Sequence, residues 1–167
     1  MGLKKNIIAF SVIGIVGTLS HFVYEWSGEN AFLGLIFPVN ESVWEHLKLI
    51  FFPALIYFVI EYILLSEKPH NYISAAITGV FCGMLSVVVL YYTVSGILGQ
   101  NIDFINIVIY FIALIFTIAK RNKIIKSNTD FSKLSVILLR SLTAMTALLF
   151  FICSFVTPKL GIFVPPA

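Results

Sequence analysis

Two histidines and several carboxylates lie at two nearby points of the sequence, in a pattern suited to ligand binding or proton transfer. His21 and Glu25 are four residues apart and therefore share one face of a helix. Glu41, Glu45 and His46 follow at the expected start of the next helix. Imidazole nitrogens and carboxylate oxygens bind zinc and other divalent ions, and they also act as general acids and bases near neutral pH. These five residues are therefore the candidate binding residues.

Three interpretations of this polar group stay open. In the first, Asn40 or Ser42 caps the second helix and Ser42 forms a capping box with Glu45, so that the carboxylates stabilise the helix start. In the second, the five candidate residues supply three or four ligands to a divalent metal ion such as zinc, the one cofactor that the sequence suggests. In the third, His46 or His21 is a general base that a carboxylate orients, with His46 and Glu45 as the catalytic candidates.

The composition places these residues in a membrane protein. Of the 167 residues, 59% are hydrophobic and only 11% are charged, and the mean hydropathy is +1.00. A water-soluble domain has about 25% charged residues, so this chain has too few charges to cover a soluble surface. The lipid bilayer is therefore the expected partner and no nucleic-acid partner is expected, while the oligomeric state stays open.

Five apolar runs are long enough to cross a bilayer, which takes about 20 helical residues. They cover residues 7–26, 42–65, 72–98, 102–119 and 134–157. The alternation typical of barrel strands is absent, so we expect an all-α membrane protein, a bundle of about five transmembrane helices in a single domain over residues 1–167. The apolar stretch 31–39 is too short to span, and we expect it to be re-entrant or interfacial and to cover a polar pocket as a lid.

The distribution of Lys and Arg predicts how the chain sits in the membrane. With the N-terminus inside, the inner segments hold eight basic residues and the outer segments hold two, Lys48 and Lys159. Basic residues concentrate in cytoplasmic loops, so we expect the N-terminus inside and the C-terminus outside the cell membrane. The His and Glu residues then face outward, together with Asp103 and Asn106 at the start of the fourth span.

Two charges and two glycines within the spans predict contacts between helices. Glu61 and Arg140 lie at similar depths near the inner boundary, and a lone charge at that depth is unfavourable, so we expect them to form an ion pair. Gly79 and Gly83 form a small-xxx-small face, which we expect to pack within the bundle.

The segment from His21 to Pro53 resembles a known family. It contains the strings HFVYEWSG at 21–28, PVNESVWEHLK at 38–48 and FFP at 51–53. With YYT at 91–93 and GILG at 96–99, these strings are similar to a family of small bacterial multi-pass membrane proteins of unknown function, over nearly the whole chain. The resemblance implies no activity, but it implies that the outer loop and the start of the second helix are the hallmark of the family.

These observations lead to two functional hypotheses of different classes. The first is a membrane protein whose outward-facing pocket binds a small polar or lipid-headgroup ligand through the five candidate residues. The alternative is a membrane-embedded hydrolase or transferase, with or without a metal ion, that acts on lipid or cell-envelope substrates.

Overall fold

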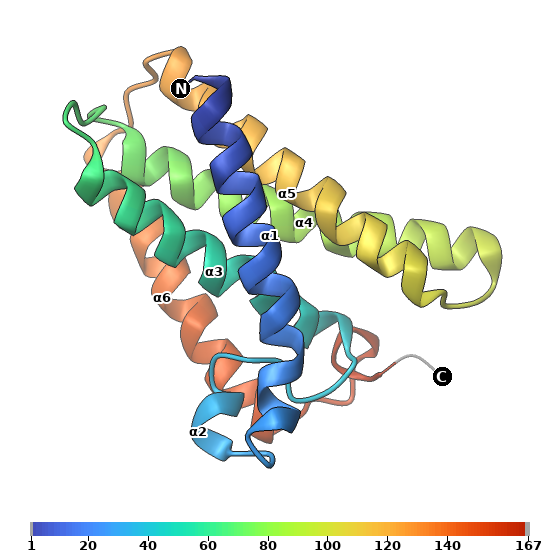
Figure 1. The fold of residues 1–167 in the computed structure, drawn as a ribbon. Helices are drawn as coiled ribbons and strands as arrows, with labels where there is room; N and C mark the ends of the chain where they lie inside the picture. The colour runs from blue at the N-terminus through green and yellow to red at the C-terminus, as the bar shows by residue number, and fades with distance from the viewer. Residues whose placement is uncertain (1, 166–167) are drawn as a thin grey trace.

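The computed structural model describes residues 2–165 and is built from helices, with no strand in that range (Figure 1). The helices are α1 (Leu3–Trp26), α2 (Ala31–Gly34), α3 (Val43–Leu64), α4 (Tyr72–Leu98), α5 (Asp103–Lys126) and α6 (Lys133–Phe155), followed by the 3-10 turn η1 (Gly161–Phe163). All except α2 and η1 are long and apolar enough to cross a membrane. The expected all-α fold with five such helices is therefore confirmed.

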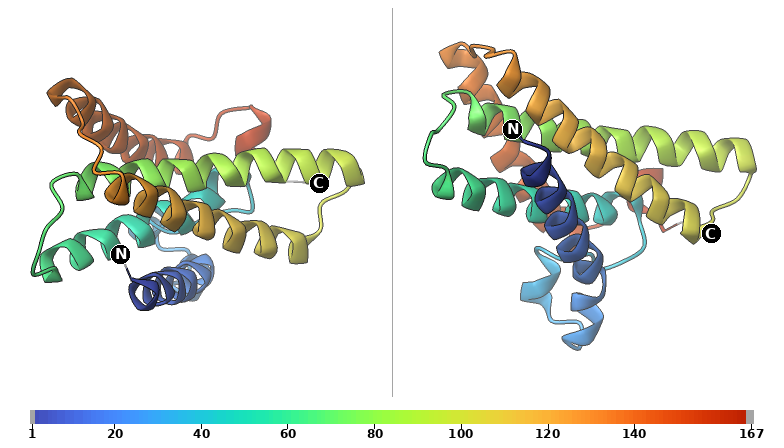
Figure 2. Two further views of the ribbon diagram at one scale, coloured as in Figure 1. Left: turned by 90° about the horizontal axis from the view of Figure 1, so that it is seen from above. Right: turned by 45° about the horizontal axis from the view of Figure 1, so that its top comes forward.

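The five long helices alternate in direction, and their polar contacts define two ends of the bundle (Figure 2). At one end, Asn122 near the end of α5 donates to Asn6 near the start of α1, with 2.9 Å between Nδ2 and Oδ1. At the other end, His21 near the end of α1 lies beside His46 near the start of α3. We call the first the Arg121 end, after the residue next to Asn122, and the second the His46 end. Helix α1 starts at the Arg121 end and α6 finishes at the His46 end, where Ser154 contacts α3.

Small residues let α4 and α5 run side by side at close range (Figures 1 and 2). A methyl group added at Gly79 would lie 2.5 Å from the carbonyl oxygen of Thr117 on α5. A methyl group added at Gly83 would collide with the Thr117 hydroxyl. Gly79 and Gly83 therefore pack within the bundle, as their spacing predicted.

Substituting Gly79 with alanine is expected to destabilise the fold by about 1–3 kcal/mol, the usual effect of overpacking. The added methyl group meets backbone, which cannot rotate away. Thermal unfolding in detergent micelles, followed by circular dichroism, measures the change. Gly96→Ala is the matched control in α4, because no atom lies within 4 Å of the added carbon there. Equal stability of the two variants would contradict close packing at Gly79.

The predicted ion pair between Glu61 and Arg140 is wrong, because Glu61 pairs with Arg121. The Arg121 Nη1 atom lies 2.7 Å from Glu61 Oε2, whereas Arg140 is exposed on α6. The physical reason is the length of α5, which continues past residue 119 to Lys126. This extension places Arg121 one turn beyond Thr117, on the face that packs against α4.

Residues 31–39 form α2 and a loop that lies across the His46 end beside the last turns of α1 and α6 (Figure 1). A methyl group added at Gly34 would lie 3.0 Å from the ring of Tyr24 on α1 and 3.4 Å from the ring of Phe155 on α6. The segment therefore covers helix ends, as expected of a short apolar stretch.

Candidate functional site

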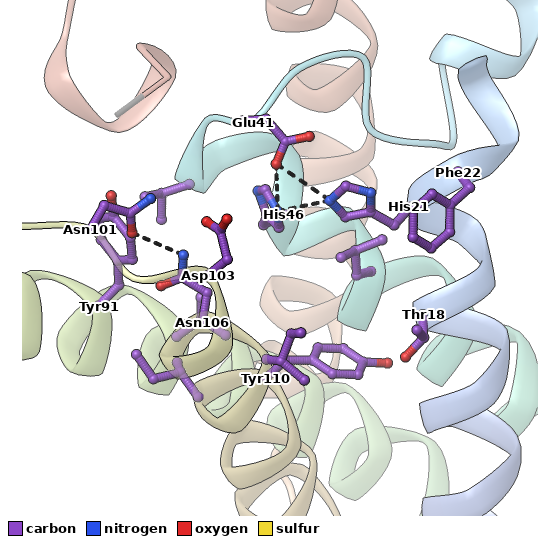
Figure 3. A pocket seen from close by; sticks show the side chains of 15 residues that line it. Thr18, His21, Phe22, Glu41, His46, Tyr91, Asn101, Asp103, Asn106 and Tyr110 are labelled. Atoms are coloured by element: carbon purple, nitrogen blue, oxygen red, sulfur yellow. Dashed lines mark hydrogen bonds and ion pairs between the residues drawn. The ribbon is translucent and has the colours of Figure 1, made fainter. Parts of the chain in front are cut away.

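Three of the predicted residues converge at the His46 end. The Nε2 atoms of His21 and His46 are 3.3 Å apart, and each lies 3.4 Å from Oε2 of Glu41 (Figure 3). We call these three residues the His-Glu cluster. The two imidazoles are about a quarter exposed and the Glu41 side chain is 61% exposed, so the cluster is open to a ligand.

Local backbone chemistry positions the two members that come from the start of α3. The Asn40 side chain accepts a hydrogen bond from the Ser42 backbone N–H at 2.9 Å, and this turn presents Glu41 just before the helix. Ser42 caps α3, since its hydroxyl accepts from the Glu45 backbone N–H at 3.3 Å. The Ser42 carbonyl lies 2.9 Å from His46 Nδ1. A carbonyl only accepts, so Nδ1 carries the proton and Nε2 is left to face the cluster.

The cluster forms part of the wall of a pocket of about 590 Å³ between α1, the start of α3, and the neighbouring parts of α4 and α5 (Figure 3). The other polar residues of the wall are Thr18, Tyr91, Asn101, Asp103, Asn106 and Tyr110. The apolar residues of the wall are Phe22, Val43, Leu49, Val87, Ile107 and Ile109. The pocket wall thus combines polar and apolar side chains, and the pocket has a size typical of small-molecule sites.

The far wall of the pocket is held by the start of α5. The Asn106 side chain donates to Asn101 Oδ1 at 2.9 Å, which ties α5 to the loop before it. Asp103 points into the pocket from the same helix start, on the side of His46 (Figure 3). Asp103 and Asn106 therefore lie at the same end of the bundle as the His-Glu cluster, as the sequence predicted.

Glu45 and Glu25, the other two candidate residues, do not join the cluster. The Glu45 carboxylate is 1% exposed and pairs with Lys48, with 2.7 Å between Oε2 and Nζ. The same oxygen accepts from the Val39 backbone N–H at 2.9 Å. Glu25 is exposed at the end of α1, and its side chain makes no ion pair among the described residues. We therefore leave Glu45 and Glu25 out of the proposed site.

The segment 31–39 does not cover this pocket, so the expectation of a lid above it is wrong. None of its residues belongs to the pocket wall. The segment instead covers Lys48, whose ammonium group donates to the carbonyl oxygens of Gly34 at 2.8 Å and Phe37 at 3.2 Å. The physical reason is that this buried Lys48–Glu45 pair offers the segment strong hydrogen-bond partners on the opposite side of α3.

Sequence reasoning did not select several residues of the pocket wall. Thr18 lies three residues before His21, so helical spacing places both on one face of α1 and gave a usable signal. Tyr91 and Tyr110 come from helices that meet the pocket only through tertiary packing. Tyr91 belongs to the YYT string of the family resemblance, which gives it no role, and no local pattern in the sequence marks Tyr110.

The fold and this site together define a class of protein. Five long apolar helices fit a multi-pass membrane protein, and one end of the bundle holds a pocket with a His-Glu cluster. The chain belongs to DUF6512, a family of unknown function whose model matches residues 2–166. This match confirms the family resemblance seen in the sequence. Comparison with curated proteins and with solved structures gave no match.

Proposed function

We propose that this protein is a multi-pass membrane protein whose pocket at the His46 end binds an amphiphile, a molecule with a small polar head and an apolar tail. The observation that carries the proposal is the mixed polar and apolar character of the pocket wall. His21, Glu41, His46 and Asp103 supply polar groups, while residues such as Leu49 and Val87 supply an apolar surface. A lipid-like molecule matches both surfaces at once.

The position of the pocket supports entry of the ligand from the bilayer. Phe22 on α1 and Ile107 on α5 both belong to the pocket wall, and they are 42% and 55% exposed. They therefore join the pocket to the apolar outer surface of two helices that we propose to be in contact with lipid. A tail that leaves the pocket between α1 and α5 stays in an apolar environment.

The charges of the pocket favour a particular type of head group. Glu41 and Asp103 contribute two carboxylates, and no Lys or Arg belongs to the pocket wall among the described residues. Such a wall attracts a head that has a positive charge or several hydrogen-bond donors. A zwitterionic head such as phosphoethanolamine meets this requirement through its ammonium group.

We also propose that the His46 end faces outward from the cytoplasmic membrane of a bacterium. The Arg121 end holds eight of the eleven basic residues: Lys4, Lys5, Lys68, Lys120, Arg121, Lys123, Lys126 and Lys133. The His46 end holds Lys48 and Lys159. This asymmetry supports a cytoplasmic location for the Arg121 end.

Replacing Ile107 with tryptophan is expected to weaken amphiphile binding by about 10-fold or more, because Ile107 belongs to the pocket wall and the larger side chain takes up space in the pocket. The probe is a monoacyl phosphatidylethanolamine, titrated into the detergent-solubilised protein and counted by native mass spectrometry. The unaltered protein is expected to bind one probe molecule per chain.

Two controls make this result specific. Val108→Trp adds the same bulk at the next position of α5, which is 40% exposed and outside the pocket wall, and it is expected to leave binding unchanged. Glycerophosphoethanolamine, the same head without a tail, is expected to bind at least about 10-fold more weakly. If glycerophosphoethanolamine bound as tightly as the probe, the ligand would instead be a small polar molecule. If Ile107→Trp and Val108→Trp bound the probe equally well, the pocket would not be the binding site.

A further inference from the structure

We infer that the His-Glu cluster binds one divalent transition-metal ion, with zinc as the best fit. The inference goes beyond amphiphile binding and does not depend on it. The three side chains offer two imidazole nitrogens and one carboxylate oxygen, a ligand set found in zinc sites that keep a fourth position open. All three atoms lie within 4.8 Å of one another and line a pocket that a ligand can enter.

The spacing of the three atoms matches a tetrahedral ion. Zinc binds nitrogen and oxygen at about 2.0–2.1 Å, so two ligands of a tetrahedral zinc ion are separated by about 3.3–3.4 Å. The observed separations within the cluster are 3.3, 3.4 and 3.4 Å. An octahedral ion with ligands at about 2.1 Å would place neighbouring ligands only about 3.0 Å apart. The spacing therefore fits a tetrahedral zinc ion and not magnesium, and the two imidazole nitrogens favour zinc over calcium, which binds oxygen ligands.

The proton positions also favour a cation among these atoms. His46 has its proton on Nδ1, where it donates to the Ser42 carbonyl, so in the neutral ring Nε2 presents a lone pair. Glu41 is an acceptor, and the Nε2 of His21 faces both. A single proton on His21 makes a good hydrogen bond to one partner only, whereas a metal ion accepts all three lone pairs. The bond from His46 Nδ1 to a carbonyl is also the usual outer partner of a metal-binding histidine.

The fourth position of such an ion faces the pocket. Asp103 also belongs to the pocket wall, on the side of His46 (Figure 3), and the cluster supplies three of the residues that line the pocket. An ion with a charge of +2 balances the two carboxylates of a wall to which no Lys or Arg of the described residues belongs. The head group of a bound molecule can then supply an oxygen as the fourth ligand.

Metal titration of the purified protein tests this inference directly. The protein is stripped with a chelator and titrated with zinc, and bound metal is measured by elemental mass spectrometry after removal of free ion. One zinc ion per chain is expected. His46→Ala and His21→Ala are each expected to weaken zinc binding by more than about 100-fold, since even the loss of an outer partner weakens binding about 10-fold to 100-fold. Cobalt, substituted for zinc, is expected to give the intense visible absorption of a tetrahedral site.

Matched variants separate this site from incidental binding. His70 is the third histidine of the chain and lies outside the cluster, so His70→Ala is expected to keep full zinc binding. Glu25→Gln removes the same charge as Glu41→Gln at an exposed position, and only Glu41→Gln is expected to weaken binding. Circular dichroism confirms that each variant is folded.

Two outcomes would overturn the inference. One is a chain that binds less than stoichiometric zinc, and the other is zinc binding that His21→Ala and His46→Ala leave unchanged. Either result leaves the amphiphile proposal intact, because that proposal is tested with Ile107→Trp and needs no metal. Conversely, if the unaltered protein binds zinc stoichiometrically but does not bind the probe, the amphiphile proposal is overturned and the zinc inference stands.

Discussion

Replacing Lys48 with methionine is expected to lower the free energy of unfolding by about 3–5 kcal/mol, the usual effect of removing one partner from a buried ion pair. The Lys48 side chain is completely buried. Its three N–H groups are shared among Glu45 Oε2, Ser154 Oγ and the two carbonyls of the 31–39 segment, at 2.6–3.2 Å. Methionine fills a similar volume but leaves the Glu45 carboxylate with no positive partner.

Unfolding in detergent micelles, followed by tryptophan fluorescence, measures this effect. Lys159→Met is the control, because Lys159 is exposed at the same end of the bundle and its loss is expected to change stability by less than about 0.5 kcal/mol. The double variant Lys48→Met with Glu45→Gln removes both charges and is expected to recover part of the loss. A loss below about 1 kcal/mol for Lys48→Met would mean that the pair behaves as a surface salt bridge.

The helices of this fold could be predicted from the sequence because the bilayer sets one simple requirement. Each crossing helix needs about 20 apolar residues, and run length alone finds them. The largest difference is at the end of α5, which continues to Lys126 as a polar helix. The predicted span ended at residue 119, so the basic residues that follow were assigned to a loop. Hydropathy shows where the apolar residues end, but a helix can continue beyond that point.

The His-Glu cluster could be predicted only in part. Glu41 and Glu45 are four residues apart and both were candidates, but α3 begins at Val43, so Glu41 lies before the helix and does not follow helical spacing. Glu45 lies in the first turn, where its side chain turns back toward the Val39 backbone N–H. Which of the two carboxylates joins the cluster thus depends on one helix boundary, and boundaries are the least certain part of any prediction from sequence.

The ion pair at the Arg121 end shows a similar limit. Pairing of Glu61 with a buried cation followed from the high energy of a lone charge in an apolar bundle, and this part of the prediction is correct. The partner was wrong because similar depth does not define which helix faces which. The spacing of Ala113, Thr117 and Arg121 by four residues marks one face of α5, and a methyl group added at Gly83 would meet both Ala113 and Thr117. This pattern could have identified Arg121.

Replacing Arg121 with leucine is the second variant expected to destabilise the fold by about 3–5 kcal/mol. The Arg121 side chain is 0% exposed, and its guanidinium carbon also lies 4.4 Å from the centre of the Phe58 ring. Glu61 is 10% exposed, and besides Arg121 it accepts a hydrogen bond from the Tyr72 hydroxyl. Without Arg121, one hydroxyl group is left to stabilise a nearly buried carboxylate, which is insufficient.

Arg140→Leu is the matched control, because it removes the same side chain from an exposed position on α6. We expect it to change the free energy of unfolding by less than about 0.5 kcal/mol. Glu61→Gln keeps the shape of the side chain and removes its charge, so a double-mutant cycle with Arg121→Leu isolates the pair and is expected to give a coupling energy of about 1–3 kcal/mol. The same cycle between Glu61 and Arg140 is expected to give no coupling. Coupling to Arg140 rather than Arg121 would mean that α5 and α6 pack against α3 differently from this structure.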